Sequence, residues 1–175
     1  MSLFVVDVEA DGPAPGLYSM VSFGVVLVDT TLVTTFYGET APITGSFIPE
    51  ALAVSNVSRA QHLAFEDPAI VIPRFVKWVN ANNAANRPTF VSDNPAFDWQ
   101  FINYYCHRYA GTNPFGHSAR RIGDYAAGVM GNWSDQTSWK KLRKTRHTHN
   151  PVDDAMGNVE ALLALFAKSG TKIPR

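Results

Sequence analysis

The first part of the chain alternates short apolar segments with turn residues. Apolar and β-branched residues dominate Leu3–Val8, which leads into acidic side chains, and they dominate Met20–Val28 as well. Such runs are typical of buried β-strands. The Pro- and Gly-rich segment Asp11–Gly16 separates the first two runs, and Asp29–Thr31 forms a tight turn before a third expected strand over Leu32–Tyr37. The pattern predicts a three-stranded meander.

The rest of the chain favours helices, with one further strand between them. We expect a short helix over Pro49–Val54, a longer one capped at Asp67-Pro68 and kinked or restarted at Pro73, a strand over Thr89–Val91, and helices over Pro95–Tyr109, Ser138–Lys144 and Pro151–Ala167. Gly38–Ser46 and Asn80–Pro88 are expected loops, and Arg121–Met130 fits either a strand or a helix. A meander followed by alternating strands and helices indicates an α/β domain with a mixed central sheet flanked by helices.

The composition indicates one compact globular domain over residues 1–175. Hydrophobic residues make up 46% and charged residues 17% of the chain, which excludes an intrinsically disordered protein. The longest apolar runs are too short to cross a membrane, and the N-terminus lacks the features of a secretory signal. The single cysteine, Cys106, cannot form an internal disulfide. We therefore expect a cytoplasmic protein that is not membrane-bound.

The charges are balanced in number but unevenly distributed. Fifteen Lys and Arg residues match fifteen Asp and Glu residues, which argues against a protein that coats nucleic acid through its overall charge. Residues 1–58 contain no Lys or Arg. A basic cluster precedes His149 and comprises Arg120, Arg121, Lys140, Lys141, Arg143, Lys144 and Arg146, with His147 among them. The cluster fits either a solvated face or a rim that binds a nucleic-acid strand, and its position favours the rim.

The first candidate site is the pair of acids in Asp7-Val8-Glu9. Residues two apart on a strand project from the same face, so both carboxylates should lie together at the end of an apolar strand. Their mutual repulsion and their desolvation disfavour two negative charges there. A divalent cation resolves both problems, and oxygen ligands of this kind suit Mg²⁺ or Mn²⁺. A solvated strand end is the alternative interpretation.

Two further segments place acids near expected helix starts. Asp98 lies one turn into a helix that Asn94 is expected to cap, and it could face the same sheet edge as Asp7. Asp154 lies about one turn into the last helix, and the loop before it carries His149, a residue suited to proton abstraction near neutral pH. Taken singly, these residues also fit an exposed helix acid, a solvated loop histidine and, with Asp153, acids favoured by the helix dipole.

Taken together, the three segments follow the order D-x-E, N-x-x-F-D and H-x-x-x-x-D. This order resembles the DEDDh branch of the DnaQ-like exonuclease superfamily, which includes RNase T, oligoribonuclease and polymerase proofreading subunits. The resemblance covers nearly the whole chain and implies an RNase H-like fold. The segments Phe47–Leu52 and Val57–Gln61 look like the connecting region of the family, though they are less specific. Two departures, Asp93 where many relatives have His and Pro151 where Ala is common, bear on substrate preference.

The resemblance also implies a two-metal catalytic site. It assigns the catalytic roles to Asp7, Glu9, Asp98, His149 and Asp154. Asp7, Glu9 and Asp154 are expected to bind one Mg²⁺ or Mn²⁺ ion. Asp7 is expected to bridge to a second ion, which Asp98 holds directly or through water. His149 is the expected general base, and the spacing of five positions from it selects Asp154 as the last ligand.

The implied reaction is the release of nucleoside 5′-monophosphates from the 3′ end of a single-stranded nucleic acid. We expect backbone groups of Ala10 and Asp11 to meet the terminal 3′-hydroxyl. Tyr18 and Met20 are expected either to pack on the terminal bases or to be ordinary core residues. The remaining expected substrate contacts are Asn94 and Phe97.

The resemblance also bears on the nature of the substrate and of the assembly. The analogy with compact RNA-trimming members favours RNA, and single-stranded DNA is the alternative. A non-catalytic nucleic-acid-binding module on the same fold and a different metal-dependent phosphoesterase are the competing functional classes. The resemblance alone suggests a homodimer.

Overall fold

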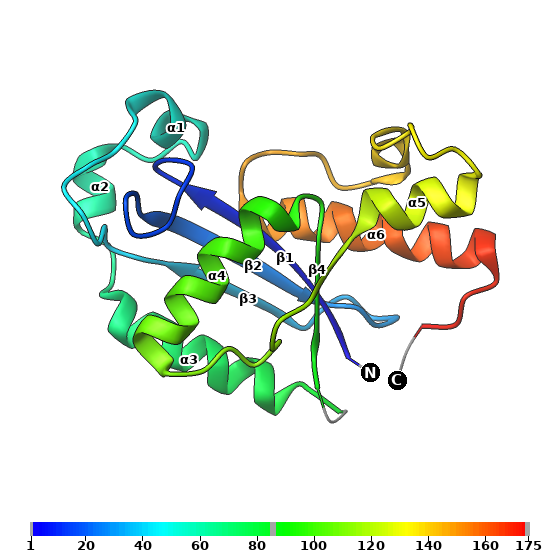
Figure 1. The fold of residues 1–175 in the computed structure, drawn as a ribbon, viewed down its shortest axis with the longest axis horizontal. Coiled ribbons are helices and arrows are strands. Elements are labelled where there is room, and N and C mark those ends of the chain that lie inside the picture. The colour runs from blue at the N-terminus through cyan, green and yellow to red at the C-terminus, as the bar shows by residue number, and fades with distance from the viewer. Residues whose placement is uncertain (1, 85–86, 174–175) are drawn as a thin grey trace.

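The protein is built around a five-stranded mixed sheet with helices on both faces (Figure 1). The structure, a computed structural model, describes residues 2–84 and 87–173. The strands are β1 Leu3–Ala10, β2 Met20–Leu27, β3 Thr35–Glu39, β4 Thr89–Ser92 and β5 Ala119–Arg121, in the order β3-β2-β1-β4-β5. β1 pairs antiparallel with β2 and parallel with β4. The predicted α/β fold with a mixed sheet and an initial meander is confirmed.

The longer helices divide between the two faces of the sheet. The helices are α1 Pro49–Val54, α2 Arg59–Leu63, α3 Pro68–Ala81, α4 Pro95–Ala110, α5 Ile122–Met130, the 3₁₀-helix η1 Ser138–Leu142 and α6 Pro151–Ser169. α3 and α4 cover one face, while α6 packs on β1 and β2 from the other with α5 beside it (Figure 1). None of the described helices has the length and apolar content needed to span a bilayer.

The alternation of side chains along β1 decides which face carries the acids. Phe4 and Val6 belong to the apolar cluster under α3 and α4, whereas Leu3 belongs to the cluster under α6. Side chains two apart on a strand share a face. Asp7 and Glu9 therefore point to the face that α6 covers, and the expectation that the two acids lie together is confirmed.

Gly24 allows α6 to approach the sheet next to these acids. In the β1–β2 register, Gly24 lies opposite Asp7. A Cβ atom on Gly24 would lie 2.2 Å from the carbonyl carbon of Pro151 and 2.3 Å from the amide nitrogen of Val152. Because glycine has no side chain, the first turn of α6 can dock directly on β2. This docking carries Asp154 to the end of β1.

The third strand differs from its predicted range, Leu32–Tyr37. β3 begins later and runs to Glu39, so the first residues of the predicted loop Gly38–Ser46 belong to the strand. The turn before it is longer because the carboxylate of Asp29 accepts hydrogen bonds from two following backbone amides. Leu32 then adopts a left-handed backbone conformation with φ of 54°. These contacts hold the chain out of the sheet for several more residues.

Pro73 and the segment after α3 also differ from the prediction. α3 continues through Pro73, so the predicted restart at this proline is wrong. Of the predicted loop Asn80–Pro88, Asn80 and Ala81 belong to α3, and residues 85–86 lie outside the described residues. The other predicted elements are confirmed with small shifts at their ends.

Two short elements were not predicted from the sequence pattern, and one segment was left open between strand and helix. α2 begins with a reciprocal capping box between Ser58 and Gln61, a signal present in the sequence. β5 consists of Ala119–Arg121, which has no apolar pattern to mark it as a strand. The ambiguous segment Arg121–Met130 supplies the last residue of β5 and then forms α5.

Candidate active site

Four carboxylates from distant parts of the sequence converge near the end of β1. Asp7 and Glu9 lie on β1, and Asp154 lies in the first turn of α6. Oxygen atoms of these three side chains lie within 4.8 Å of one another. Asp98, in the first turn of α4, reaches the same strand from the other side of the sheet, where its Oδ1 accepts a hydrogen bond from the amide of Val8 at 3.1 Å.

The position of Asp98 follows from the short pairing between β1 and β4. β4 pairs only with Leu3, Phe4 and Val5, so the edge of β1 beyond Val5 has no neighbouring strand. A buried backbone amide needs a hydrogen-bond partner. The carboxylate of Asp98, which is only 4% exposed, supplies that partner. The interaction fixes Asp98 beside the other acids.

The electrostatics of the cluster favour the binding of a cation. Burial, together with the neighbouring carboxylates, raises the pKa of Asp7 well above its ordinary value, although Arg143 opposes this effect. Burial also raises the pKa of Glu9 to about 7 and the pKa of Asp98 to about 7. Crowded carboxylates of this kind are neutralised either by protons or by a metal ion. Since all the ligand atoms are oxygen, the cluster fits a hard divalent cation such as Mg²⁺.

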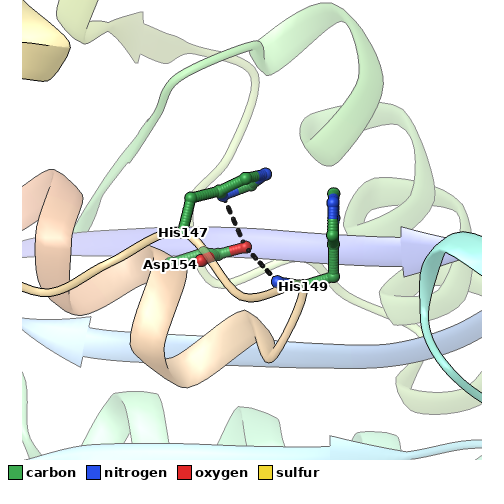
Figure 2. A group of neighbouring side chains, drawn as sticks. All are labelled: His147, His149 and Asp154. Atoms are coloured by element: carbon green, nitrogen blue, oxygen red, sulfur yellow. Dashed lines mark hydrogen bonds and ion pairs between the residues drawn. The ribbon is translucent and has the colours of Figure 1, made fainter.

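His149 lies directly beside these acids, on the loop that precedes α6. Its amide donates to Oδ2 of Asp154 at 3.1 Å (Figure 2). The amide of Thr148 donates to Oδ1 of the same carboxylate at 2.8 Å. Its Nδ1 lies 3.4 Å from Oε1 of Glu9. The side chain is 41% exposed, so the ring is accessible from solvent. The buried carboxylate of Asp154 therefore positions the loop and brings the histidine to the cluster.

Comparison with known proteins identifies the family. No protein-family model matches the chain. The chain is 36% identical over 160 residues to the 3′-5′ DNA exonuclease Cap18 of Escherichia coli, an alignment that covers 90% of this chain and 82% of that protein. The chain belongs to the DEDDh family of 3′→5′ exonucleases. It is a hydrolytic enzyme that acts on nucleic acid.

Solved structures of other nucleases share the fold of this DEDDh exonuclease. The nuclease domain of 3′hExo, a DEDDh family member bound to rAMP, superposes with a TM-score of 0.76 at 16% identity, covering 99% of this chain and 94% of that one. Exonuclease I of E. coli, in complex with a dT13 oligonucleotide, gives a TM-score of 0.68 at 14% identity, covering 96% of this chain and 41% of that one. At these identities the similarity supports the RNase H-like fold alone.

The exonuclease does not expose all of the residues expected to touch substrate. Met20 is fully buried in the core under α3 and α4, so its side chain cannot contact a terminal base. The core interpretation of Met20 is therefore the correct one. The ring of Tyr18 packs over Gly12 within its own loop, where a Cβ atom on Gly12 would lie 2.2 Å from it. Tyr18 is partly exposed, and its contact with substrate stays a prediction.

Backbone contacts by Ala10 and Asp11 are constrained by the fold. Ala10 lies where the register between β1 and β2 shifts. The amide of Asp11 donates to the carbonyl oxygen of Ser19, and its carbonyl oxygen accepts from the amide of Ile48. Both backbone groups of Asp11 already have partners within the protein, and contact of either residue with a 3′-hydroxyl stays a prediction.

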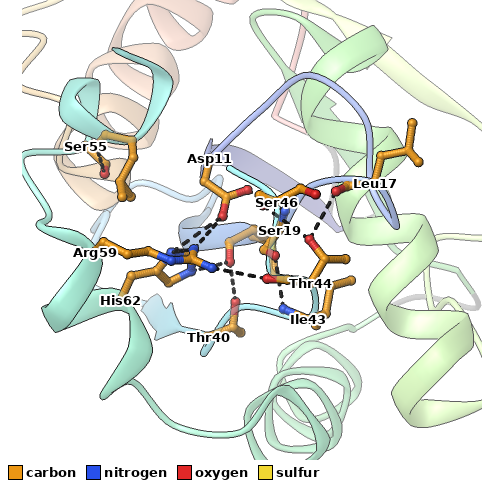
Figure 3. A network of polar contacts seen from close by, with 12 residues as sticks. Asp11, Leu17, Ser19, Thr40, Ile43, Thr44, Ser46, Ser55, Arg59 and His62 are labelled. Atoms are coloured by element: carbon orange, nitrogen blue, oxygen red, sulfur yellow. Dashed lines mark hydrogen bonds and ion pairs between the residues drawn. The ribbon is translucent and has the colours of Figure 1, made fainter. Parts of the chain in front are cut away.

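The side chain of Asp11 anchors the loops around the end of β1 (Figure 3). Its fully buried carboxylate accepts hydrogen bonds from the amide of Ser19 at 2.5 Å and from the guanidinium of Arg59 at 3.0 Å. Arg59 also donates to the carbonyl oxygen of Thr44, and buried His62 lies 3.7 Å from the same carboxylate. The network ties α2 and the loop before α1 to the strand that carries Asp7.

Asn94 and Phe97 lie at the start of α4, next to Asp98. Asn94 occupies the N-cap position, but its side chain forms no capping hydrogen bond and is exposed. Phe97 is partly buried, with its ring centroid 5.2 Å from that of Phe101. The predicted capping by the Asn94 side chain is therefore wrong. A substrate contact by either residue stays a prediction.

Two residues of the basic segment, His147 and Arg143, lie near the acids, although neither was assigned an individual role from the sequence. The Nδ1 of His147 lies 2.8 Å from Oδ2 of Asp154. Arg143 is only 11% exposed, donates to Asn158, and lies 3.6 Å from Oδ2 of Asp93. His147 could have been noticed from its spacing of two from His149 in an extended loop. Nothing in the sequence separates Arg143 from the exposed cations around it.

The ion-free exonuclease is expected to lose stability as pH rises from about 4 to about 7. The folded-state pKa values of Glu9 and Asp98, about 7, exceed their ordinary values of 4.5 and 3.8. The folded protein therefore holds protons that the unfolded chain has released, and this contribution to stability is lost as pH rises through about 4 to 7. Mg²⁺ should restore stability, because it binds the ionised carboxylates.

Thermal unfolding in chelator and in Mg²⁺, at both ends of this range, measures the effect. Asp98→Asn keeps the acceptor for Val8 but removes one titrating group, so its melting temperature should fall less than that of the wild type. Burial lowers the pKa of His62, which acts in the opposite direction but equally in both proteins. A wild-type melting temperature that falls no more than that of Asp98→Asn would contradict this account.

Proposed function

We propose that this exonuclease degrades single-stranded DNA from its 3′ end and releases nucleoside 5′-monophosphates. The convergence of Asp7, Glu9, Asp98 and Asp154 with His149 carries the proposal, because this arrangement suits metal-assisted phosphodiester hydrolysis. The 36% identical relative named as a DNA exonuclease supports DNA as the substrate. The sequence-based preference for RNA rested on analogy with RNA-trimming members and becomes the second candidate.

The four carboxylates would hold the divalent cations. Asp7, Glu9 and Asp154 form one set of oxygen ligands, and Asp98 lies close enough for its charge to raise the pKa of Asp7. Mg²⁺ or Mn²⁺ suits ligands of this kind. When bound, such ions supply positive charge that favours ionisation of the attacking water and stabilises charge on the phosphate and the departing 3′ oxygen.

His149 is proposed as the group that takes the proton from the attacking water. Its Nδ1 lies against Glu9, which leaves Nε2 for the proton. Imidazole is the side chain most often used for proton transfer near neutral pH. The hydrogen bond from its own amide to Asp154 holds the ring near the acids. Glu9 and Asp154 would thus serve both as metal ligands and as supports for the base.

The basic cluster supplies a surface for the strand. Lys140 and Arg143 lie against Asp93, so part of the cluster supports the fold near α4. Its other exposed Lys and Arg members are Arg120, Lys141, Lys144 and Arg146. We propose that these side chains contact backbone phosphates, which carry no sequence information. A homodimer, a cytoplasmic location and the assignment of the whole chain to one domain stay predictions.

DNA and RNA oligonucleotides of the same sequence test which sugar the exonuclease prefers in its substrate. We expect a 5′-labelled DNA oligomer to be shortened from its 3′ end at least about tenfold faster than RNA of the same sequence, the ratio that corresponds to about 1.4 kcal/mol. A DNA oligomer with a single 3′-terminal ribonucleotide locates the discrimination at the terminal sugar, where a protein can sense the 2′-hydroxyl. Equal or faster degradation of RNA would make RNA the substrate. The Asp7→Asn variant controls for contaminating nucleases.

A further inference from the structure

A second group of metal-ligating side chains lies next to the four carboxylates. The side chains of His147, His149 and Asp154 offer two imidazole nitrogens and one carboxylate oxygen, all within 4.8 Å of one another (Figure 2). Nδ1 of His147 lies 2.8 Å from Oδ2 of Asp154. The two rings are 4.4 Å apart between centroids and inclined by 67°. Exonuclease chemistry as proposed above has no use for His147.

We propose that His147, His149 and Asp154 form an inhibitory site for a transition-metal ion of the Zn²⁺ type. Two imidazoles and one carboxylate are the ligand set that zinc commonly takes when it keeps a fourth position open. The ligand set of Asp7, Glu9 and Asp154 contains oxygen alone and suits Mg²⁺ or Mn²⁺. The two groups therefore select different ions, although they share Asp154.

The backbone prearranges this site. Asp154 is 1% exposed, and its two oxygens accept the amides of Thr148 and His149. The loop thus wraps around the carboxylate, and His149 adopts a left-handed conformation with φ of 60°. A conformation that is uncommon for residues other than glycine persists only where surrounding contacts hold it. The result is that both rings lie beside one fixed carboxylate.

The site is also open to solvent. The side chain of His147 is 50% exposed and that of His149 is 41% exposed. An ion can therefore enter without opening the core, and water can occupy the fourth position. The two rings are exposed and can rotate toward an ion, whereas the buried carboxylate is held by its hydrogen bonds.

An ion at this site blocks turnover, and this part of the inference rests on the proposed function. It occupies His149, the proposed proton acceptor, and it competes for Asp154, a proposed ligand of the catalytic cations. His147 takes part in neither proposed role. The inhibition should therefore depend on His147, whereas the magnesium-dependent reaction needs it much less.

Calorimetric titration of the full chain with Zn²⁺, in excess Mg²⁺ and without nucleic acid, tests the binding. His147→Gln keeps an amide that can donate to Asp154 but removes the imidazole. We expect this variant to bind zinc at least about tenfold more weakly than the wild type, since even outer-shell changes at metal sites cost about that much. His117→Gln, an exposed histidine in the loop before β5, is the matched control and should bind as the wild type does. Equal zinc affinity in His147→Gln and the wild type would overturn the site.

Inhibition is measured separately, as the zinc concentration that halves each protein's own zinc-free rate in Mg²⁺. We expect that concentration to rise at least about tenfold in His147→Gln and to stay unchanged in His117→Gln. An unchanged value in His147→Gln would overturn the inhibitory role. If no protein digested nucleic acid, the proposed function would fail, while the calorimetry would still decide whether the site exists.

Discussion

Replacing Asp7 with asparagine is expected to reduce the rate of 3′-terminal nucleotide release by at least about a thousandfold. Asp7 lies among the other acids. Its pKa is raised by three neighbouring carboxylates, those of Asp98, Glu9 and Asp154. Asparagine keeps the shape of the side chain, so β1 should keep its register. The substitution removes the charge on which cation binding depends, and the loss of metal affinity should accompany the loss of rate.

Asp153→Asn is the matched control for this variant. Asp153 precedes Asp154 on α6, but its side chain is exposed and lies outside the group of acids that could hold a metal. Its replacement should leave the rate within a few-fold of the wild type, as expected for a surface position. Single-turnover rates and Mn²⁺ affinity of both variants provide the measurement. A near-normal rate in Asp7→Asn would remove Asp7 from the site.

Replacing His149 with asparagine is expected to lower the single-turnover rate by roughly two to four orders of magnitude, the usual contribution of a general base. Asparagine tolerates the positive φ of 60° at this position, so the loop should keep its conformation. The amide that donates to Asp154 also remains. The rate should therefore fall because the proton acceptor is lost.

Metal affinity separates the possible roles of His149. The four carboxylates are intact in His149→Asn, so Mn²⁺ should bind about as tightly as in the wild type. A rate loss that follows a matching loss of Mn²⁺ affinity would make His149 a ligand or a structural support. A nearly normal rate would make it a solvated loop residue. Only a large rate loss at unchanged affinity agrees with the proposed base.

The sequence predicted the acid pair because strand alternation is a strictly local property. Asp7 and Glu9 had to share a face once Leu3–Val8 was assigned to a strand, and the structure has them together. The approach of Asp154 was suggested by motif order but could not be derived from local pattern. It depends on Gly24, whose missing side chain matters only because Pro151 packs against it.

The features that the sequence did not reveal depend on long-range contacts, on burial, or on segments without a hydrophobic pattern. The Asp11–Arg59 pair joins residues far apart in the chain, and no periodicity marks either of them. β5 was missed because its Ala-Arg-Arg sequence lacks an apolar pattern. The role of Met20 was ambiguous because an apolar residue at the start of a strand suits a binding surface and a core equally well. In the structure Met20 is fully buried, which makes it a core residue.

The central claim is hydrolysis from the 3′ end at the four-carboxylate site, and paired end-blocked oligonucleotides test it most directly. The same single-stranded oligomer carries a phosphate at either its 3′ or its 5′ end, and each form is digested in Mg²⁺ by the wild type and by Asp7→Asn. We predict mononucleotide release by the wild type from the 5′-blocked oligomer, strong inhibition by the 3′ block, and no detectable release by Asp7→Asn. Equal digestion of both oligomers, or cleavage of a circular single strand by the wild type, would contradict the account.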